Sequence, residues 1–299
     1  MNREDIKTIV TLPIVILIGI GIAFAGSQYN ISQIMGLPLF AFCVALAFVI
    51  QWLVFIPSFL FQTEKLFDIT GSITYISVTL IAVVLNPKVD ARSLILMIMV
   101  IIWAGRLGTF LVRRIHKAGK DQRFDDIKPH FFRFLNTWTL QGLWVTFTLA
   151  AALVVFTTPL KKDLSWFAYI GILIWLVGFT FESVADLQKN RFRAKPENKG
   201  KFIHTGLWSI SRHPNYFGEI VIWIGVAVIA LPVLRGWQWI TLISPVFVAL
   251  LLIKISGIPK LEQYADKKWG GQEDYEDYTK KTPVLVPKII SYSKNIIPE

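Results

Sequence analysis

Residues 164–193 read LSWFAYIGILIWLVGFTFESVADLQKNRFR, and this stretch decides the class of fold. Its first 18 residues, 164–181, carry no charge, and a mixed series of acids and bases follows. A run of about 20 apolar residues is long enough to cross a bilayer as one helix. The stretch therefore predicts a transmembrane helix whose last turns carry charge.

The composition agrees with a membrane protein and excludes several other classes. Of 299 residues, 54% are hydrophobic and 17% are charged, whereas soluble domains carry about 25% charged residues. The 22 Phe and 11 Trp exclude a disordered chain. One Cys excludes a disulfide framework, and four His with no i, i+4 pair predict no metal site. The net charge of +11 indicates topology and contact with anionic membrane lipids, not nucleic acid.

Hydropathy predicts an all-α integral membrane protein, a single bundle of about eight transmembrane helices. The predicted spans are roughly 8–26, 36–61, 70–86, 93–112, 137–158, 164–186, 215–233 and 236–256. Loops 113–136 and 187–213 hold seven Lys and Arg each, and the chain from 254 onward holds eight. These segments alternate with cation-poor connections, which predicts that both termini and a C-terminal tail are cytosolic, and the chain suits a bacterial inner membrane.

We expect one membrane domain over residues 1–299. It consists of N-terminal helices (1–92), a larger region with a pocket that faces the cytosol (93–288) and a tail (289–299). The sequence does not indicate an oligomeric state.

The charges that end the sixth span are the first candidate site. Glu182, Asp186, Lys189 and Arg193 fall within about 60° of one another on a helix. Such a stripe costs several kcal/mol if it faces lipid. One interpretation is a helix end that water solvates; we favour a polar cavity that opens to the cytosol, because Glu182 follows an apolar run.

The second candidate site surrounds the start of the seventh span. Arg212 and His213 precede Pro214, and Pro is favoured in the first turn of a helix. Asn215, Glu219 and Trp223 then recur on one face of the helix. A salt bridge from Glu219 to Arg212 or to the tail is the alternative explanation, but five polar groups in eight residues favour a ligand.

The third candidate site lies after the last span. It contains Glu262, Lys267, Lys268, Tyr275 and Tyr278. Taken alone, this segment suits anchoring to anionic lipid. In the fourth span, Arg106 is a further cation of unassigned role, and Gly105 and Gly108 beside it permit close helix contact.

Together these sites suit a cytosolic cofactor with phosphates and a flat ring. The Gly-x-Gly-x-x-Gly fingerprint and the phosphate-binding loop are both absent from the sequence. Side chains must therefore hold the phosphates, a task that favours Arg with help from Lys.

Residues 93–288 resemble the steroid 5α-reductase family and its bacterial DUF1295-type relatives, within a superfamily of sterol reductases and isoprenylcysteine methyltransferases. The resemblance lies in three motifs: Asp186…Arg193, then Gly206-Leu-Trp…Arg-His-Pro-Asn-Tyr…Gly-Glu…Trp-Ile-Gly225, then Tyr275-x-x-Tyr278…Pro283. It implies NADPH as the cofactor. It also implies cofactor contacts at Asp186, Arg193, Asn215, Glu219, Trp223 and Tyr278, with Glu182 where the family has Asn.

The catalytic half departs from this family. Pro57-Ser58-Phe59 is present, but Val54-Phe55 precedes it where the steroid enzymes have Gln-Glu. Trp103 takes the position of a family Tyr and cannot donate a proton at physiological pH. These departures argue against a 3-oxo-4-ene steroid as the substrate.

We therefore expect a membrane oxidoreductase in which NADPH reduces an activated C=C bond of a lipophilic substrate that enters from the bilayer. A hydride adds to the β-carbon of an enone-like system while an acid polarises the carbonyl. Candidate acids are Tyr75, Glu64 and Asp68, although an ordinary solvated turn also explains each. The Lys267–Lys268 pair or Arg193 is expected to bind the 2′-phosphate.

Two other functions stay open. Arg212-His213-Pro214, Glu262 and the Tyr275…Pro283 segment resemble the prenylcysteine methyltransferases about as well, which implies S-adenosylmethionine. A lipid-binding or transport protein would use the same cavity without a cofactor.

Overall fold

The computed structural model describes residues 3–288, and the predicted tail at 289–299 lies outside the described residues. Eight of its helical segments are long and apolar enough to cross a membrane, which confirms the predicted all-α membrane bundle. The α-helices are α1 (Arg3–Gly26), α2 (Leu39–Leu60), α3 (Phe67–Val84), α4 (Ala91–Ala118), α5 (Phe131–Thr157), α6 (Trp166–Ala194), α7 (Pro214–Ala230), α8 (Ile243–Leu250), α9 (Ile258–Trp269) and α10 (Glu273–Lys281). Two short strands, β1 (Gln33–Ile34) and β2 (Leu37–Pro38), form an antiparallel hairpin.

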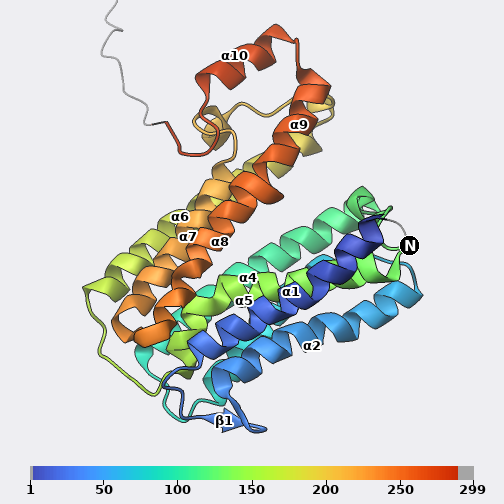
Figure 1. Ribbon diagram of the computed structural model, residues 1–299. Helices are drawn as coiled ribbons and strands as arrows, with labels where there is room; N and C mark the ends of the chain where they lie inside the picture. Colours follow the sequence, from blue (N-terminus) through green and yellow to red (C-terminus); the bar gives the residue numbers. More distant parts are fainter. Residues whose placement is uncertain (1–2, 289–299) are drawn as a thin grey trace, which may run out of the picture. The chain divides into compact units, whose positions relative to one another are not determined.

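The chain divides into two compact units. Unit 1 comprises Met1–Gly171 and Val226–Phe247, and unit 2 comprises Ile172–Gly225 and Val248–Glu299. Within unit 1, α5 packs against α1, α2, α3 and α4; Figure 1 shows α1, α2, α4 and α5 running alongside one another. Unit 2 holds most of α6 and α7 together with α9 and α10. The expectation of one membrane domain stays a prediction.

Several helices extend beyond the predicted spans, among them α4, α5 and α6. The sixth helix does not end at 186 but continues to Ala194, since its charged residues share one face and leave the helical hydrogen bonds intact. The eighth span begins as a 3-10 helix (Gly236–Leu242), continues as α8 and passes through a π-helical turn (Leu251–Ile255). After Gly257, α9 begins with Pro259 in its first turn.

Aromatic side chains form a core cluster in unit 1. Phe55, Phe124, Phe134 and Trp138 are buried together, and Phe67 packs against them. Phe124 comes from a 3-10 turn (Gln122–Phe124) in the α4–α5 loop, so this loop is folded onto the helices. Close-packed rings account for much of the stability of such a core.

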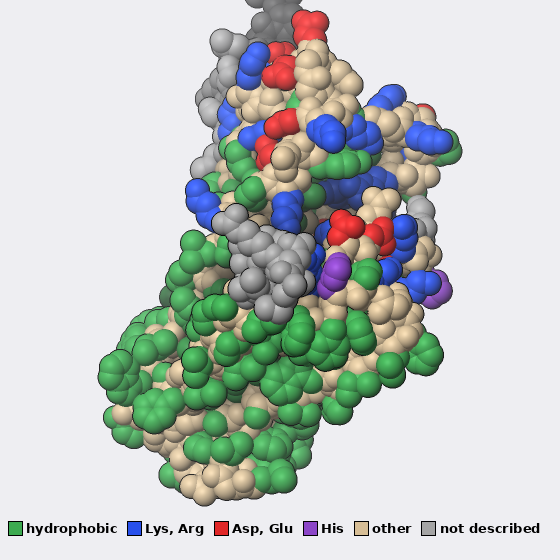
Figure 2. Space-filling model, turned by 45° about the vertical axis from the view of Figure 1, so that its right-hand side comes forward, with side chains coloured by type: hydrophobic (Ala, Val, Ile, Leu, Met, Phe, Trp, Pro, Cys, Tyr) green, Lys and Arg blue, Asp and Glu red, His purple; other side chains and the backbone are tan. Residues whose placement is uncertain are grey.

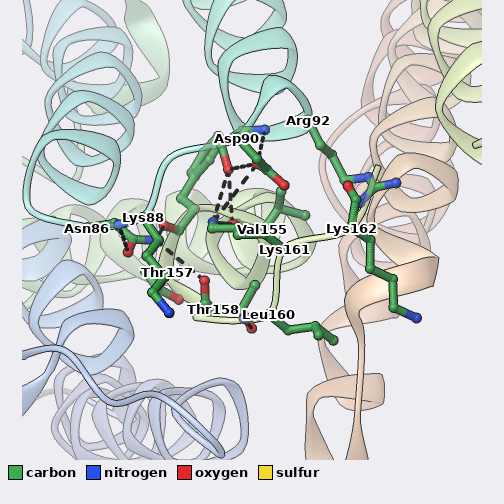
Figure 3. Close-up of polar contacts among 12 residues, drawn as sticks. Asn86, Lys88, Asp90, Arg92, Val155, Thr157, Thr158, Leu160, Lys161 and Lys162 are labelled. Carbon is green, nitrogen blue, oxygen red and sulfur yellow. Dashed lines mark hydrogen bonds and ion pairs between the residues drawn. The ribbon is translucent and has the colours of Figure 1, made fainter. Parts of the chain in front are cut away.

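The opposite loops of unit 1 are tied together by polar contacts (Figure 3). Asp90 caps α4 by accepting a hydrogen bond from the backbone N–H of Ser93 at 2.9 Å. Arg92 is fully buried and donates to the carbonyls of Lys162 and Asp163, both at 3.0 Å. Lys161 approaches Asp90 to 3.9 Å. Because its charge is solvated by carbonyls, Arg92 can lie inside the end of a span.

Surface chemistry follows the spans. Figure 2 shows hydrophobic side chains over a broad continuous area, whereas Lys, Arg, Asp and Glu gather together away from it. Exposed apolar residues of the spans include Leu17, Leu53, Ile98 and Leu173. Such side chains are expected where helices face lipid. The protein is therefore an integral membrane protein.

Candidate functional site

The site in unit 2 depends on very close packing of α6 on α7. A Cβ atom on Gly218 would lie 2.5 Å from the backbone nitrogen of Glu182, and a Cβ on Gly178 would lie 2.6 Å from the nitrogen of Ile222. Both neighbours are backbone atoms, which cannot move aside as a flexible side chain can. Small residues let membrane helices approach in this way, and here they fix the position of Glu182.

The polar face predicted on α6 is buried at Glu182 and Asp186, intermediate at Lys189 and exposed at Arg193. Glu182 and Asp186 are 3% and 7% exposed, so the interpretation as a solvated helix end does not hold for these two. Asn215, in the first turn of α7, donates from Nδ2 to Asp186 Oδ1 at 3.2 Å. Trp223 is also buried, and Glu219 is half-buried. The structure thus brings Asp186 and Asn215 together, as the motif suggested.

Glu262 of α9 joins the two residues that precede α7. Its Oε2 lies 2.5 Å from an Arg212 guanidinium nitrogen, and its Oε1 lies 2.7 Å from His213 Nε2. Burial lowers the pKa of His213, and this effect outweighs the opposite effect of Glu262. A neutral His213 must donate from Nε2, because a carboxylate only accepts. Its Nδ1 is then an acceptor, and no described residue bonds to it.

A 3-10 turn (η3, Gly206–Ser209) docks on α6 beside these groups. Gly206 has φ +63°, a conformation that strains residues with a Cβ. Gln188 accepts a hydrogen bond from the backbone N–H of Leu207 at 2.9 Å, and Trp208 donates from Nε1 to the carbonyl of Ala185 at 3.1 Å. These bonds place the Trp208 ring under the Lys189 ammonium, 4.4 Å from its centroid.

Aromatic residues from the chain's last helices complete the site. Phe202 packs against Trp269, Tyr275 and Tyr278 with ring centroids 5.3–5.9 Å apart. The Tyr278 hydroxyl donates to the carbonyl of Trp208, and the Tyr275 hydroxyl donates to Asp266, both at 2.7 Å. Burial raises the pKa of both tyrosines, and the carboxylate of Asp266 adds to the effect at Tyr275. Both hydroxyls are therefore protonated and serve as donors.

These groups surround a cavity of about 130 Å³. Seven predicted cofactor residues line it, namely Lys189, Arg193, Arg212, His213, Glu262, Tyr275 and Tyr278. The other seven lie outside its lining: Glu182, Asp186, Asn215, Glu219, Trp223, Lys267 and Lys268.

Sequence reasoning missed several lining residues. Lys201 and Phe202 follow the turn at Gly200, and Trp208 was quoted in a motif without a role. Tyr264 and Trp269 of α9 also line the cavity. The signal that the sequence offered for these residues is a cation, Lys201, close to two aromatic residues, Phe202 and Trp208.

The three predicted proton donors all lie in unit 1. Tyr75 is buried, and its ring packs edge-on against Trp103 at 5.0 Å. Glu64 binds Lys128 at 2.8 Å and accepts a hydrogen bond from the backbone N–H of Asp121 at 3.0 Å. Asp68 pairs with Arg114 at 2.9 Å. Both carboxylates are thus held by contacts with the α4 end and the α4–α5 loop, while the roles predicted for all three in catalysis stay predictions.

Replacing Glu64 by glutamine should lower the free energy of unfolding at pH 7 by about 2 kcal/mol, because it breaks a buried ion pair. Burial raises the pKa of Glu64, but hydrogen bonds from Lys128 and from the backbone of Asp121 outweigh it, and the pKa lies below its usual value. Its stabilisation is therefore complete above about pH 4.3, the usual value for Glu, and is lost as the pH falls through the folded-state pKa.

Thermal melting of both proteins between pH 7 and pH 3 tests this prediction. The difference in Tm should shrink toward the acid end. Glu197→Gln is the control, since Glu197 is exposed and 4.0 Å from its partner Lys195. A Glu64→Gln protein that melts like the wild type at pH 7 would contradict it.

Two glycines near Arg106 differ in role. A Cβ on Gly108 would lie 2.7 Å from Ser72 Oγ, so the close contact predicted there is confirmed. A Cβ on Gly105 would meet no atom within 4 Å, so the prediction was wrong at that position. Gly105 faces away from the neighbouring helices.

Comparisons with known proteins give relatives that are named as reductases and one that is named as a probable methyltransferase. The Delta(14)-sterol reductase of Methylotuvimicrobium alcaliphilum is 32% identical over 181 residues, which cover 55% of this chain and 40% of that protein. The steroid 5-alpha-reductase of Gossypium hirsutum is 27% identical over 130 residues, or 43% of this chain and 45% of that protein. A probable O-methyltransferase of Ustilaginoidea virens is 44% identical over 46 residues, or 15% of this chain and 16% of that protein.

The chain spans less than half the length of these relatives, and no solved structure matches it. A comparison with protein families matches residues 54–282 to the family described as a protein of unknown function, DUF1295. This match covers most of the chain, including every residue that lines the cavity of unit 2. The chain therefore belongs to the DUF1295 family of steroid 5α-reductase-like membrane proteins.

Proposed function

We propose that this protein is a membrane reductase that uses NADPH to reduce an activated C=C bond of a lipophilic substrate. One observation carries the proposal: the cavity of unit 2 combines four cationic side chains with a wall of aromatic rings. Relatives named sterol reductase and steroid 5-alpha-reductase support the same reading.

The lining residues fit one end of such a dinucleotide. Arg193 and Lys201 offer positive charge to phosphate, and Arg212 is held in place by Glu262. Trp208 and Trp269 offer flat surfaces for a ring. The free Nδ1 of His213 would accept a hydrogen bond from a ribose hydroxyl or a base amine. Each of these contacts is one that a phosphorylated nucleotide can make.

NADPH supplies a hydride when bound, and the protein must supply binding, orientation and a proton. When a hydride is added to one carbon of the C=C bond, the other carbon of that bond must receive a proton. Of the three predicted donors, Glu64 and Asp68 are each engaged with a cation, Lys128 at 2.8 Å and Arg114 at 2.9 Å. Tyr75 is therefore the strongest candidate for the acid in unit 1.

Changing Tyr75 to phenylalanine should lower kcat about 100-fold, the usual contribution of a general acid. NADPH affinity should not change, because the cofactor residues lie in unit 2 and the ring contact with Trp103 survives. Steady-state kinetics and cofactor titration check the two parts separately. Wild-type kcat in Tyr75→Phe would exclude the hydroxyl as the acid.

Lys201 should discriminate NADPH from NADH, because it lines the cavity whereas Lys267 and Lys268 do not. We expect Lys201→Ala to weaken NADPH binding about tenfold, the loss typical of one charge-assisted hydrogen bond, and to leave NADH binding unchanged. Competition titrations measure the ratio, with Lys280→Ala of α10 as the control. Two results would contradict the assignment. One is a wild-type ratio of NADPH to NADH affinity in Lys201→Ala. The other is loss of the preference for NADPH in the Lys267→Ala/Lys268→Ala double variant.

A methyltransferase is the second candidate. The 46-residue match to a probable O-methyltransferase favours it, and S-adenosylmethionine also carries an adenine ring and a ribose. It lacks phosphates, however, and so would leave Arg193 and Lys201 without a ligand charge to bind.

Titration of the purified protein with NADPH, NADH and S-adenosylmethionine separates these functions. Saturable binding of NADPH that weakens in Arg193→Ala and Asn215→Ala supports the reductase. Binding of S-adenosylmethionine alone would replace it with the methyltransferase. No binding of any of the three would favour a lipid-binding or transport protein. From the cation-rich loops we also propose that both termini and the cavity face the cytosol of a bacterial cell.

A further inference from the structure

The connection between α1 and α2 is an apolar hairpin that lies outside the spans. Residues 27–38 contain no charged side chain, and β1 pairs with β2 so that Met35 and Gly36 form the two-residue tip. Figure 1 shows the hairpin beyond the ends of both helices. Tyr29, Ile31 and Met35 are 49%, 67% and 90% exposed, whereas a connection that lies in water is normally polar.

The backbone at the tip makes the presence of a methionine informative. Met35 has φ +52° and Gly36 has φ +79°, so both residues lie in the left-handed region. A two-residue hairpin turn with positive φ at both positions favours Asn followed by Gly, and most side chains with a Cβ are disfavoured there. Asn at position 35 would suit both the turn and water. The exposed apolar side chain therefore indicates a contact with something outside the chain.

A second apolar segment of unit 1 is fastened to this hairpin. The 3-10 helix η5 (Gly236–Leu242) packs against α1. Gln238 is buried and donates from Nε2 to the backbone carbonyl of Gln28 at 2.6 Å. Its neighbours Trp237 and Trp239 are 61% and 51% exposed. The exposed residues of the hairpin and of η5 form what we call the hairpin patch: Tyr29, Ile31, Met35, Leu37, Trp237 and Trp239.

Lipid is the partner that the hairpin patch fits. Because α1 ends at Gly26 and α2 begins at Leu39, both ends of the hairpin start at the membrane surface. The lipid-facing surface continues into the patch through Phe24 in the last turn of α1, which is 79% exposed. Trp and Tyr concentrate at membrane interfaces. Arg235 lies beside the patch, with its guanidinium 4.8 Å from the Tyr29 ring centroid, and a cation suits lipid phosphate.

The backbone of the hairpin limits how deeply it can enter the bilayer. Ser32 donates from its N–H to Asn30 Oδ1 at 3.1 Å, and its carbonyl accepts from the N–H of Leu39 at 2.9 Å. The strands pair at two positions each, so their outer edges need other hydrogen-bond partners. Hydrocarbon offers none, whereas lipid headgroups and water do. The hairpin therefore suits the boundary between headgroups and acyl chains.

We propose that the hairpin patch inserts into the headgroup and acyl boundary of one leaflet and anchors this end of unit 1 in the bilayer. Met35 supplies a flexible apolar tip that adapts to disordered acyl chains. Trp237 and Trp239 supply rings with an apolar body and a polar N–H, which suit the level of the headgroups. This inference concerns a lipid-binding surface of unit 1 and does not depend on the function proposed for the cavity of unit 2.

The test uses full-length protein in phospholipid nanodiscs with a fluorescent label on Met35→Cys. The one native cysteine, Cys43, is fully buried, so the wild type serves as the unlabelled reference. Brominated lipid quenches a label among acyl chains, and iodide quenches a label in water. The ratio of lipid to iodide quenching should be several-fold higher at residue 35 than at a labelled Lys162→Cys, because interfacial segments reach about 5–10 Å into the boundary.

Lys162 is the matched control position, an exposed residue of the α5–α6 loop at the same end of unit 1. It bonds to Arg92 through its backbone carbonyl, which the substitution keeps. A second experiment places the label on Ile31→Cys and changes the tip. Met35→Asn suits the turn but removes the apolar side chain, so the quenching ratio at residue 31 should fall toward that of the control. Met35→Leu should keep the ratio high.

Three results would overturn the proposal. Equal quenching ratios at residues 35 and 162 would place the tip in water. Protection of residue 35 from both quenchers would mean that a second copy or another protein covers the hairpin patch. An unchanged ratio at residue 31 in Met35→Asn would show that the apolar tip does not hold the hairpin in lipid.

Discussion

Gly218→Ala should lower the free energy of unfolding by about 3 kcal/mol, at the upper end of what overpacking costs. The added methyl carbon would lie 2.5 Å from the backbone nitrogen of Glu182 and 2.6 Å from the carbonyl oxygen of Gly178. Neither atom can rotate away, so α6 and α7 must separate. That separation also displaces Glu182 and Asn215, and cofactor binding should weaken with stability.

The reciprocal change, Gly178→Ala, should have a similar effect, because its Cβ would meet the same helix pair. Gly105→Ala is the matched control, a glycine in another span with no atom within 4 Å of an added Cβ. Alanine there should stabilise the helix by up to about 1 kcal/mol. Thermal melting in detergent checks all three. Equal Tm values for Gly218→Ala and the wild type would refute the close packing.

Glu262→Ala should weaken NADPH binding about 100-fold. The carboxylate holds both Arg212 and His213, so its loss releases two cavity residues at once. Breaking a buried pair also leaves the remaining charge without its partner, and such truncations cost roughly 2–5 kcal/mol in binding. Glu262→Gln should keep part of the affinity, because an amide oxygen can still accept from His213.

Asp277→Ala is the control for this prediction. Asp277 is an exposed acid of α10 that pairs with Lys281 and lies outside the cavity of unit 2 described above. Isothermal titration with NADPH should give a wild-type Kd for the control. Wild-type affinity in Glu262→Ala would show that Arg212 and His213 need no carboxylate to hold the cofactor, or that the cofactor binds elsewhere.

Hydropathy was sufficient to predict the eight spans, because lipid requires about 20 apolar residues in each crossing. It could not locate the end of α6. There the charged residues occupy one face, and a helix persists when its polar side chains are solvated or paired. The interruption of the eighth span was also missed, since a π turn has no composition of its own.

Seven of the predicted residues line the cavity of unit 2, and two of them, Arg212 and His213, come from the motif between Gly206 and Gly225. The assignments on α9 show the limit of reading charge alone. Leu261, Ala265 and Trp269 line the cavity at intervals of four, which is one face of a helix. Lys267 is two positions from Ala265, roughly 200° around the helix, and so lies on the other side.

Lys201 and Phe202 could not be predicted from periodicity. They belong to an irregular segment between α6 and η3 and reach the cavity through tertiary contacts such as the Phe202–Tyr275 ring pair. Glu64 illustrates a different limit of the sequence. A carboxylate in a short loop looked available, and only the fold showed that Lys128, 64 positions later, neutralises it.

The central claim is that the charged and aromatic groups of unit 2 form a nucleotide site. An experimental structure determined with NADPH is the most direct measurement of that claim. We predict density for the nucleotide in the cavity between Trp208, Arg212 and Tyr275, with phosphate oxygens near Arg193 or Lys201. An NADPH complex in which this cavity holds only side chains and the nucleotide lies elsewhere would contradict it.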